Sequence, residues 1–189
     1  MTTLGPAAVG APKALLVDDR RENLTAVAAL LQGLPVETVA VTSGEDALKQ
    51  LLLDDFALIM LDAQMPDMDG FETASRIKAR ERTRHIPIIF LTAADREAQM
   101  ALRGYAAGAV DYLIKPIDPW VLRAKVSVFV ELWNKSRELE AQAALTRERE
   151  QYCRALEAAI DGALAALRGA AGVRDIGRAV RLLEQAGPH

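Results

Sequence analysis

The acidic stretch from Asp62 to Gly70 (Asp-Ala-Gln-Met-Pro-Asp-Met-Asp-Gly) contains the first candidates for chemistry in this sequence. It follows an apolar run, Phe56 to Leu61, which indicates a buried strand with a carboxylate directly after it. In open α/β sheets, ligands bind and reactions occur at the carboxyl ends of the strands. One aspartate before a loop is more often just part of an acidic turn, so Asp62 needs further support.

That support comes from three other places where a reactive group follows an apolar run: the acidic pair Asp18-Asp19, Thr92 and Lys115. Each has an ordinary structural explanation, because Asp and Thr cap helices and lysine is common at surfaces. A parallel sheet, however, brings the carboxyl ends of its strands to one edge, where these side chains can converge. Three crowded carboxylates repel one another unless a hard cation such as Mg²⁺ lies among them.

In such a cluster Asp62 is the expected nucleophile, because an aspartyl carboxylate can attack phosphorus and form an acyl phosphate. The Lys115 ammonium and the Thr92 hydroxyl would supply charge and a hydrogen bond to the phosphoryl group. A metal ion would neutralise the charge that develops during the transfer. The sequence therefore predicts phosphoryl transfer to Asp62 with Mg²⁺ as cofactor, for which Mn²⁺ can substitute.

The elements that must position these groups are five apolar runs that alternate with helical patterns. This alternation predicts an α/β fold with a doubly wound, five-stranded parallel sheet in flavodoxin-like order and right-handed crossovers. The expected strands are Lys13 to Val17, Val36 to Val41, Phe56 to Leu61, Pro87 to Leu91 and Val110 to Ile114. The expected helices are Leu24 to Leu31, Ser43 to Leu52, Phe71 to Lys78, and Asp95 to Gly104 or Ala107.

The pattern changes after Asp118, where Pro119 is well placed to begin a helix and no breaker occurs between Trp120 and Asp161. Gly169 to Gly172 interrupts the helical pattern, and a second apolar stripe then runs from Val173 to Leu183. We expect a long C-terminal helical extension that ends in a helical hairpin. The predicted organisation is a flexible tail (1–12), an α/β domain (13–130), and a helical linker and hairpin for dimerisation or docking (131–189).

Residues 13 to 130 resemble the receiver domain of bacterial two-component response regulators. The resemblance rests on Asp18-Asp19, on Asp62 with Met65-Pro66-x-Met68-Asp69-Gly70, on Leu91-Thr92-Ala93, and on Asp111-Tyr112-Leu113-Ile114-Lys115-Pro116. It implies transfer of a phosphoryl group to Asp62 from a sensor histidine kinase or a phosphotransfer protein.

The resemblance also implies a role for each site residue. Mg²⁺ is held by Asp19, Asp62 and the backbone carbonyl of Gln64, with Asp18 assisting. Thr92 and Lys115 contact the phosphoryl group, and Tyr112 swings inward together with Thr92 as a switch. The Lys115-Pro116 peptide bond is expected to be cis.

Composition excludes several other classes of protein. The formal net charge of -3 gives no reason to expect nucleic-acid binding, and residues 131–189 carry nine basic and nine acidic side chains. No apolar run approaches the ~18 residues that a membrane span requires. The single cysteine, Cys153, suits a reducing compartment, so a cytoplasmic location without DNA or membrane partners is expected.

The C-terminal third leaves two outputs open. In one, phosphorylation controls a homodimer or a docking surface formed by the C-terminal helices, which have one apolar side each. In the other, the chain is the receiver portion of a larger signalling enzyme, and residues 131–189 connect it to a kinase or phosphatase domain. The sequence contains no separate catalytic domain, so the only activity expected of the chain itself is Mg²⁺-dependent self-phosphorylation and dephosphorylation at Asp62.

Overall fold

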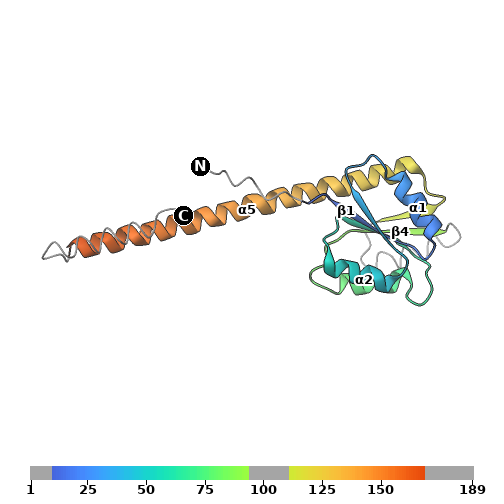
Figure 1. The fold of residues 1–189 in the computed structure, drawn as a ribbon, viewed down its shortest axis with the longest axis horizontal. Coiled ribbons are helices and arrows are strands. Elements are labelled where there is room, and N and C mark those ends of the chain that lie inside the picture. Colours follow the sequence, from blue (N-terminus) through green and yellow to red (C-terminus); the bar gives the residue numbers. More distant parts are fainter. Residues whose placement is uncertain (1–9, 94–110, 169–189) are drawn as a thin grey trace. The chain divides into compact units, whose positions relative to one another are not determined.

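The computed structural model describes residues 10–93 and 111–168 of the chain. Its centre is a parallel sheet of five strands in the order β2-β1-β3-β4-β5 (Figure 1). The strands are β1 (Lys13–Val17), β2 (Glu37–Val41), β3 (Leu58–Asp62), β4 (Ile88–Ala93) and β5 (Asp111–Lys115). This order confirms the flavodoxin-like, doubly wound fold that the sequence predicts.

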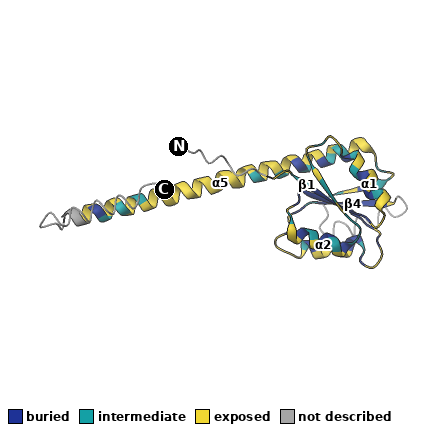
Figure 2. Ribbon diagram, viewed as in Figure 1, coloured by how far each residue is buried: buried dark blue, intermediate teal, exposed yellow. Residues whose placement is uncertain are grey.

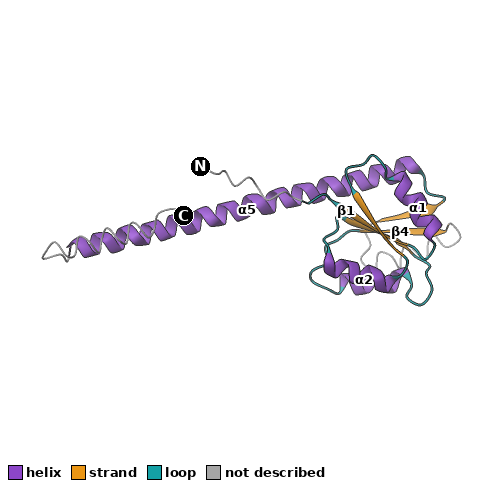
Figure 3. Ribbon diagram, viewed as in Figure 1, coloured by secondary structure: helices purple, strands orange, loops and turns teal. Residues whose placement is uncertain are grey.

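Alternation along the strands divides the core between the two faces of the sheet, because successive side chains in a strand point to opposite sides. On β1, Leu15 and Val17 belong to one hydrophobic cluster, and Ala14 and Leu16 belong to the other. The first cluster includes residues of α2 (Gly44–Leu53) and α3 (Gly70–Lys78). The second includes residues of α1 (Arg21–Leu30) and of the start of α5, which begins at Pro119. Figure 3 shows helices on both faces of the sheet, and Figure 2 shows the burial concentrated in the strands between them.

The helix ends follow the capping chemistry that their sequences provide. The Ser43 hydroxyl accepts a hydrogen bond from the Asp46 N–H at the start of α2. Asp69 caps α3 in the same way by accepting from the Glu72 N–H. Neither Asp18 nor Asp19 caps α1. The N-cap residue of that helix is Arg20, and no side chain makes a capping hydrogen bond there.

Helix α5 runs from Pro119 to Arg168, longer than the last helix of a sheet domain requires. Asp118 accepts hydrogen bonds from the N–H groups of its first turn, and Leu122, Val126 and Val130 are buried in the core. The chain divides into two compact units, Met1–Ser136 and Arg137–His189, and α5 contributes to both.

Two predicted elements lie outside the described residues: the helix expected from Asp95, and the second helix of the hairpin, which is expected after the break at Gly169 to Gly172. Among the residues that the structure describes, no helix is long and apolar enough to cross a membrane.

Candidate functional site

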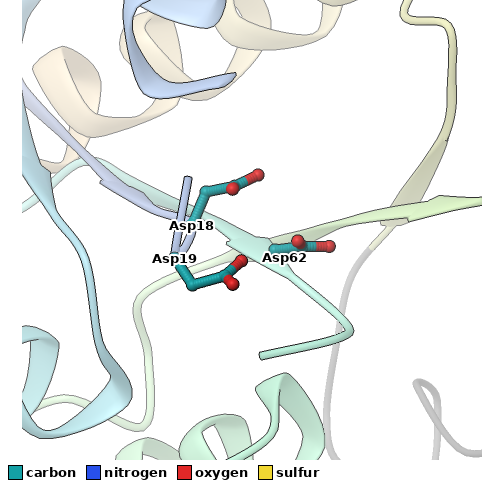
Figure 4. A group of neighbouring side chains, drawn as sticks. All are labelled: Asp18, Asp19 and Asp62. Carbon is teal, nitrogen blue, oxygen red and sulfur yellow. The ribbon is translucent and has the colours of Figure 1, made fainter. Parts of the chain in front are cut away.

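Three carboxylates meet at the carboxyl edge of the sheet. Asp18 and Asp19 follow β1, and Asp62 is the last residue of β3, which lies beside β1 in the sheet (Figure 4). Oxygen atoms from all three side chains lie within 4.8 Å of one another. Asp18 and Asp62 are buried, whereas Asp19 is exposed, so the cluster is open to solvent on one side.

The loop after β3 turns sharply, and this turn fixes the backbone around Asp62. Asp67 adopts a left-handed conformation with φ of 63°, which Asp tolerates better than most residues. Gly70 then returns so close to the strand end that a Cβ atom there would lie 2.2 Å from the carbonyl oxygen of Asp62. Only glycine fits at position 70 without displacing the backbone of the predicted nucleophile.

Lys115 is the cation of the cluster. It lies at the end of β5, and its Nζ atom is 2.9 Å from an oxygen of Asp18 and 3.2 Å from an oxygen of Asp62. The peptide bond that follows, Lys115-Pro116, is cis, as expected. A single ammonium group therefore bridges two buried carboxylates that belong to neighbouring strands.

Burial raises the pKa of the Asp62 carboxyl above its ordinary value of 3.8. The charge of Lys115 opposes this shift, whereas the negative charge of Asp18 adds to it. Hydrogen bonds from Lys115 and from the Gln64 N–H, whose nitrogen lies 3.4 Å from Oδ1, also lower the pKa. The net result is a carboxylate that is more costly to ionise than an exposed aspartate while no cation other than Lys115 is beside it.

The predicted switch residues lie on β4, which is next to β3, and on β5, which is next to β4. Thr92 is buried near the end of β4 and pairs in register with Ile114 of β5. Tyr112 is the second residue of β5, pairs with Phe90 and is 36% exposed. Thr92 is paired with Ile114, and Tyr112 lies two residues before Ile114 on the same strand. Because side chains two residues apart on a strand share a face, Thr92 and Tyr112 lie on the same side of the sheet.

The donor set fits a hard divalent cation. Three carboxylates offer oxygen ligands within a small volume, and oxygen is what Mg²⁺ prefers. The excess of negative charge in the pocket, which Lys115 offsets only in part, would be balanced by such an ion. Neither the role of the Gln64 carbonyl as a ligand nor the particular roles of the other site residues is tested by this arrangement, and these assignments stay predictions.

One residue that contacts the site is not among those predicted from the sequence. The amide nitrogen of Asn23, in the first turn of α1, lies 2.9 and 3.0 Å from the two oxygens of Asp18. Its position four residues before the buried Val27, on the inward face of the helix, is the signal that could have pointed to it.

Comparison with known proteins places this arrangement in a family. Residues 14–127 match the model of the response regulator receiver domain. The chain is 38% identical over 112 residues to the response regulator PleD of Caulobacter vibrioides, a segment that is 59% of this chain and 24% of PleD. It is 40% identical over 111 residues to the sensor histidine kinase GacS of Pseudomonas protegens, covering 57% of this chain and 12% of GacS.

A solved structure of the chemotaxis protein CheY4 of Vibrio cholerae is similar to 64% of this chain, over 99% of its own length. The TM-score is 0.59 at 28% identity. The matched segment is only a small part of PleD and of GacS. One of these relatives is named as a response regulator and the other as a sensor histidine kinase. What the comparisons share is the receiver domain itself, and this chain belongs to the response regulator receiver family.

Proposed function

We propose that Asp62 accepts a phosphoryl group from the phosphohistidine of a sensor kinase or a phosphotransfer protein, and that this exchange occurs in the cytoplasm. The observation that carries the proposal is the position of Lys115, whose ammonium group contacts both Asp62 and Asp18 at the edge of a three-carboxylate cluster. A cation held there can meet the oxygens of a phosphoryl group that arrives at Asp62.

In the proposed reaction, an oxygen of Asp62 forms a bond to phosphorus while the bond from phosphorus to the donor's histidine nitrogen breaks. That nitrogen keeps the electron pair, and an acyl phosphate forms on Asp62. Water later attacks the acyl phosphate, which releases inorganic phosphate and restores the carboxylate. Lys115 turns from its carboxylate partners to the phosphoryl oxygens, and the Thr92 hydroxyl donates a hydrogen bond to another of them.

Mg²⁺, or Mn²⁺ in its place, would be held by Asp19, Asp62 and the carbonyl of Gln64, with Asp18 assisting. It would neutralise the charge that builds up as phosphorus passes between the two partners.

The test of this assignment is uptake of phosphate from a small phosphodonor, measured by intact mass with Mg²⁺ and with a chelator. We expect uptake only with the metal, and none in Asp62→Asn, because an amide is not a competent nucleophile. Asp67→Asn is the matched control: it removes a carboxylate from the same loop and suits the left-handed backbone there. Uptake by Asp62→Asn at the wild-type rate would show that the assignment is wrong.

The proposed switch couples this chemistry to the β4–β5 side of the domain. As the Thr92 hydroxyl moves toward the phosphoryl group, the half-exposed ring of Tyr112 on the same face moves into the space. We expect Thr92→Ala to retain uptake of phosphate but to lose the change in assembly that follows it. Equal assembly responses in wild type and Thr92→Ala would contradict this mechanism.

The proposed output is a homodimer formed by the C-terminal helices. Its support is the row of exposed apolar side chains on α5, among them Leu132, Leu139 and Ile160, which a second copy could cover. The alternative, a connector to a kinase or phosphatase domain, is supported by the small share of PleD and GacS that the matched segment represents.

A further inference from the structure

We infer that Asn23 is a positioning residue of the acidic site, which holds the Asp18 carboxylate in place for metal binding and for release of Lys115. The inference rests on the proposed function of the cluster, but it concerns a residue outside the set that the family resemblance implies. It starts from two contacts: the Asn23 amide nitrogen is 2.9 Å from Oδ1 and 3.0 Å from Oδ2 of Asp18. A donor that contacts both oxygens fixes the plane of the carboxylate as well as its position.

Asp18 has two other donors, and they differ in what they can do during the reaction. The N–H of Arg20 donates to Oδ1 at 3.0 Å and is part of the backbone, so it stays. Lys115 donates to Oδ2 at 2.9 Å, but the proposed mechanism needs this ammonium at the phosphoryl group. When Lys115 leaves, Asn23 becomes the remaining side-chain donor to Asp18 among those that the described residues provide.

The surroundings of this contact leave no easy replacement for the amide. A void of about 10 Å³ lies beside Asp18 and Asn23, and its other lining residues are apolar: Leu16, Val17, Leu24, Val27, Met60 and Leu91. A space of this size is at the lower limit for one water molecule, which in any case needs two or more polar partners. Without Asn23, a nearly fully buried charge would therefore lose a hydrogen bond that the wall around it cannot supply.

The neutral character of Asn23 suits a metal site. A second lysine or arginine at this position would also satisfy Asp18, but its charge would compete with a divalent cation for the same carboxylates. The amide donates a hydrogen bond to the Asp18 carboxylate and adds no charge to the pocket. Residues that orient ligands in this way typically contribute 10–100-fold to metal affinity.

The experiment compares Asn23→Leu and Asn23→Ala in the full chain. Leucine has the same branched shape, is larger and has no donor, so it keeps water out, whereas alanine enlarges the void and admits water as a partial substitute. We expect the dissociation constant for Mn²⁺, measured by calorimetry without any phosphodonor, to rise about 10-fold in Asn23→Leu and less in Asn23→Ala. Thr25→Ala, a change on an exposed part of the same helix, is the control and should bind Mn²⁺ as wild type does.

A second readout separates positioning from a loss of folded structure. The rate of phosphate uptake by Asn23→Ala should fall at saturating Mn²⁺ as well as at low Mn²⁺, because Asp18 is then loosely held after Lys115 leaves. Melting temperature with chelator reports the structural effect alone. If Asn23→Leu does not fold, the Mn²⁺ affinity of Asn23→Ala decides.

Wild-type Mn²⁺ affinity in folded variants would overturn the inference. Failure of the proposed function appears differently, as wild-type protein that binds Mn²⁺ but never takes up phosphate.

Discussion

At the scale of single residues, the site pairs a buried carboxylate with neighbours that both favour and oppose its charge. Asp62 ends β3 and Asp18 directly follows the adjacent strand β1, and one ammonium group, that of Lys115, contacts both carboxylates. The raised pKa of Asp62 shows that burial outweighs the stabilising contacts of that side chain. In the metal-free state the protein therefore retains an electrostatic cost at the proposed phosphorylation site.

This cost gives a prediction for stability against pH. A carboxyl with a raised folded-state pKa holds its proton more tightly when folded, so its contribution to stability is present at low pH. It is lost as the pH rises from the ordinary value of 3.8 through the raised value. Asp62→Asn carries no charge in either state, so with chelator it should melt at a higher temperature than wild type at neutral pH.

The difference in melting temperature between Asp62→Asn and wild type should shrink as the pH is lowered toward the ordinary value of 3.8, because the carboxyl group of folded wild-type Asp62 takes up its proton on the way. Saturating Mg²⁺ should also reduce it, because binding to the folded state stabilises wild type more than the variant. Thermal melts between about pH 4 and 8 provide the measurement. If, with chelator, the melting temperature of wild type rose relative to that of Asp62→Asn as the pH increased, this prediction would be contradicted.

At the scale of elements, the loop between β3 and α3 determines where Asp62 lies. A Cβ atom at position 70 would come within 2.2 Å of the Asp62 carbonyl oxygen and 2.9 Å of the Ala63 Cα atom. Both neighbours are backbone atoms, so neither can move aside as a flexible side chain would. The loop and the end of the strand are therefore packed as one unit.

We expect Gly70→Ala to destabilise the protein by about 1–3 kcal/mol, the usual cost of overpacking a tight site. It should also slow phosphate uptake at Asp62, because the backbone that carries the nucleophile must shift. The matched control is Gly10→Ala, which adds the same methyl group where nothing lies within 4 Å. Chemical denaturation and the uptake rate, measured on both variants, test this; an unchanged rate in Gly70→Ala would mean that the loop does not position Asp62.

The elements themselves were the most predictable part of the molecule. Strands covered on both faces read as near-continuous apolar runs, which is why β3 and the position of Asp62 at its end followed from the sequence. Contacts between distant helices carry no such local pattern. Arg123 of α5 donates to the backbone oxygens of Leu30 and Gln32 at the end of α1, and Asn23 contacts Asp18 across a loop. Residue type and spacing do not predict the Arg123 contacts, and for Asn23 they indicate only that it lies on the inward face of α1.

At the scale of the whole molecule, α5 presents apolar side chains that the described part of the chain does not cover. Leu132 is 59% exposed and Leu139 is 65% exposed, one heptad apart. Polar residues (Lys135, Gln142 and Arg149) occupy the core positions between the apolar ones. This pattern favours a pairing of two helices that is weaker in its middle than at Cys153 to Ile160.

We expect the full chain to sediment as a dimer at concentrations on the order of tens of micromolar. Leu139→Glu should shift it toward monomer, because it places a charge in the apolar seam between helices. Ala141→Glu is the control, since it adds the same charge to an exposed position on another side of α5. A wild-type chain that stays monomeric in this range, with and without beryllofluoride, would exclude the dimer.

The free thiol of Cys153, which is exposed on α5, reports the geometry of that dimer. In a parallel pair in register, the two copies of this residue face each other at one level of the seam, so mild oxidation should link the chains covalently. An antiparallel pair would separate the two thiols and leave them unlinked.

The wide separation of Lys115 and Asp18 along the chain has a consequence for folding kinetics. Their side chains meet although they are 97 positions apart in the sequence. This contact requires that β1, β3, β4 and β5 are already paired in register. Contacts between residues so distant in sequence form late, because the long loop must be closed before any contact rewards it. We therefore expect the proposed acceptance of phosphate at Asp62 to require that β5 has docked onto the other strands. A chain whose last strand has not docked would contain Asp62 without Lys115 beside it, so under the proposed function we expect such partially folded molecules to accept phosphate poorly.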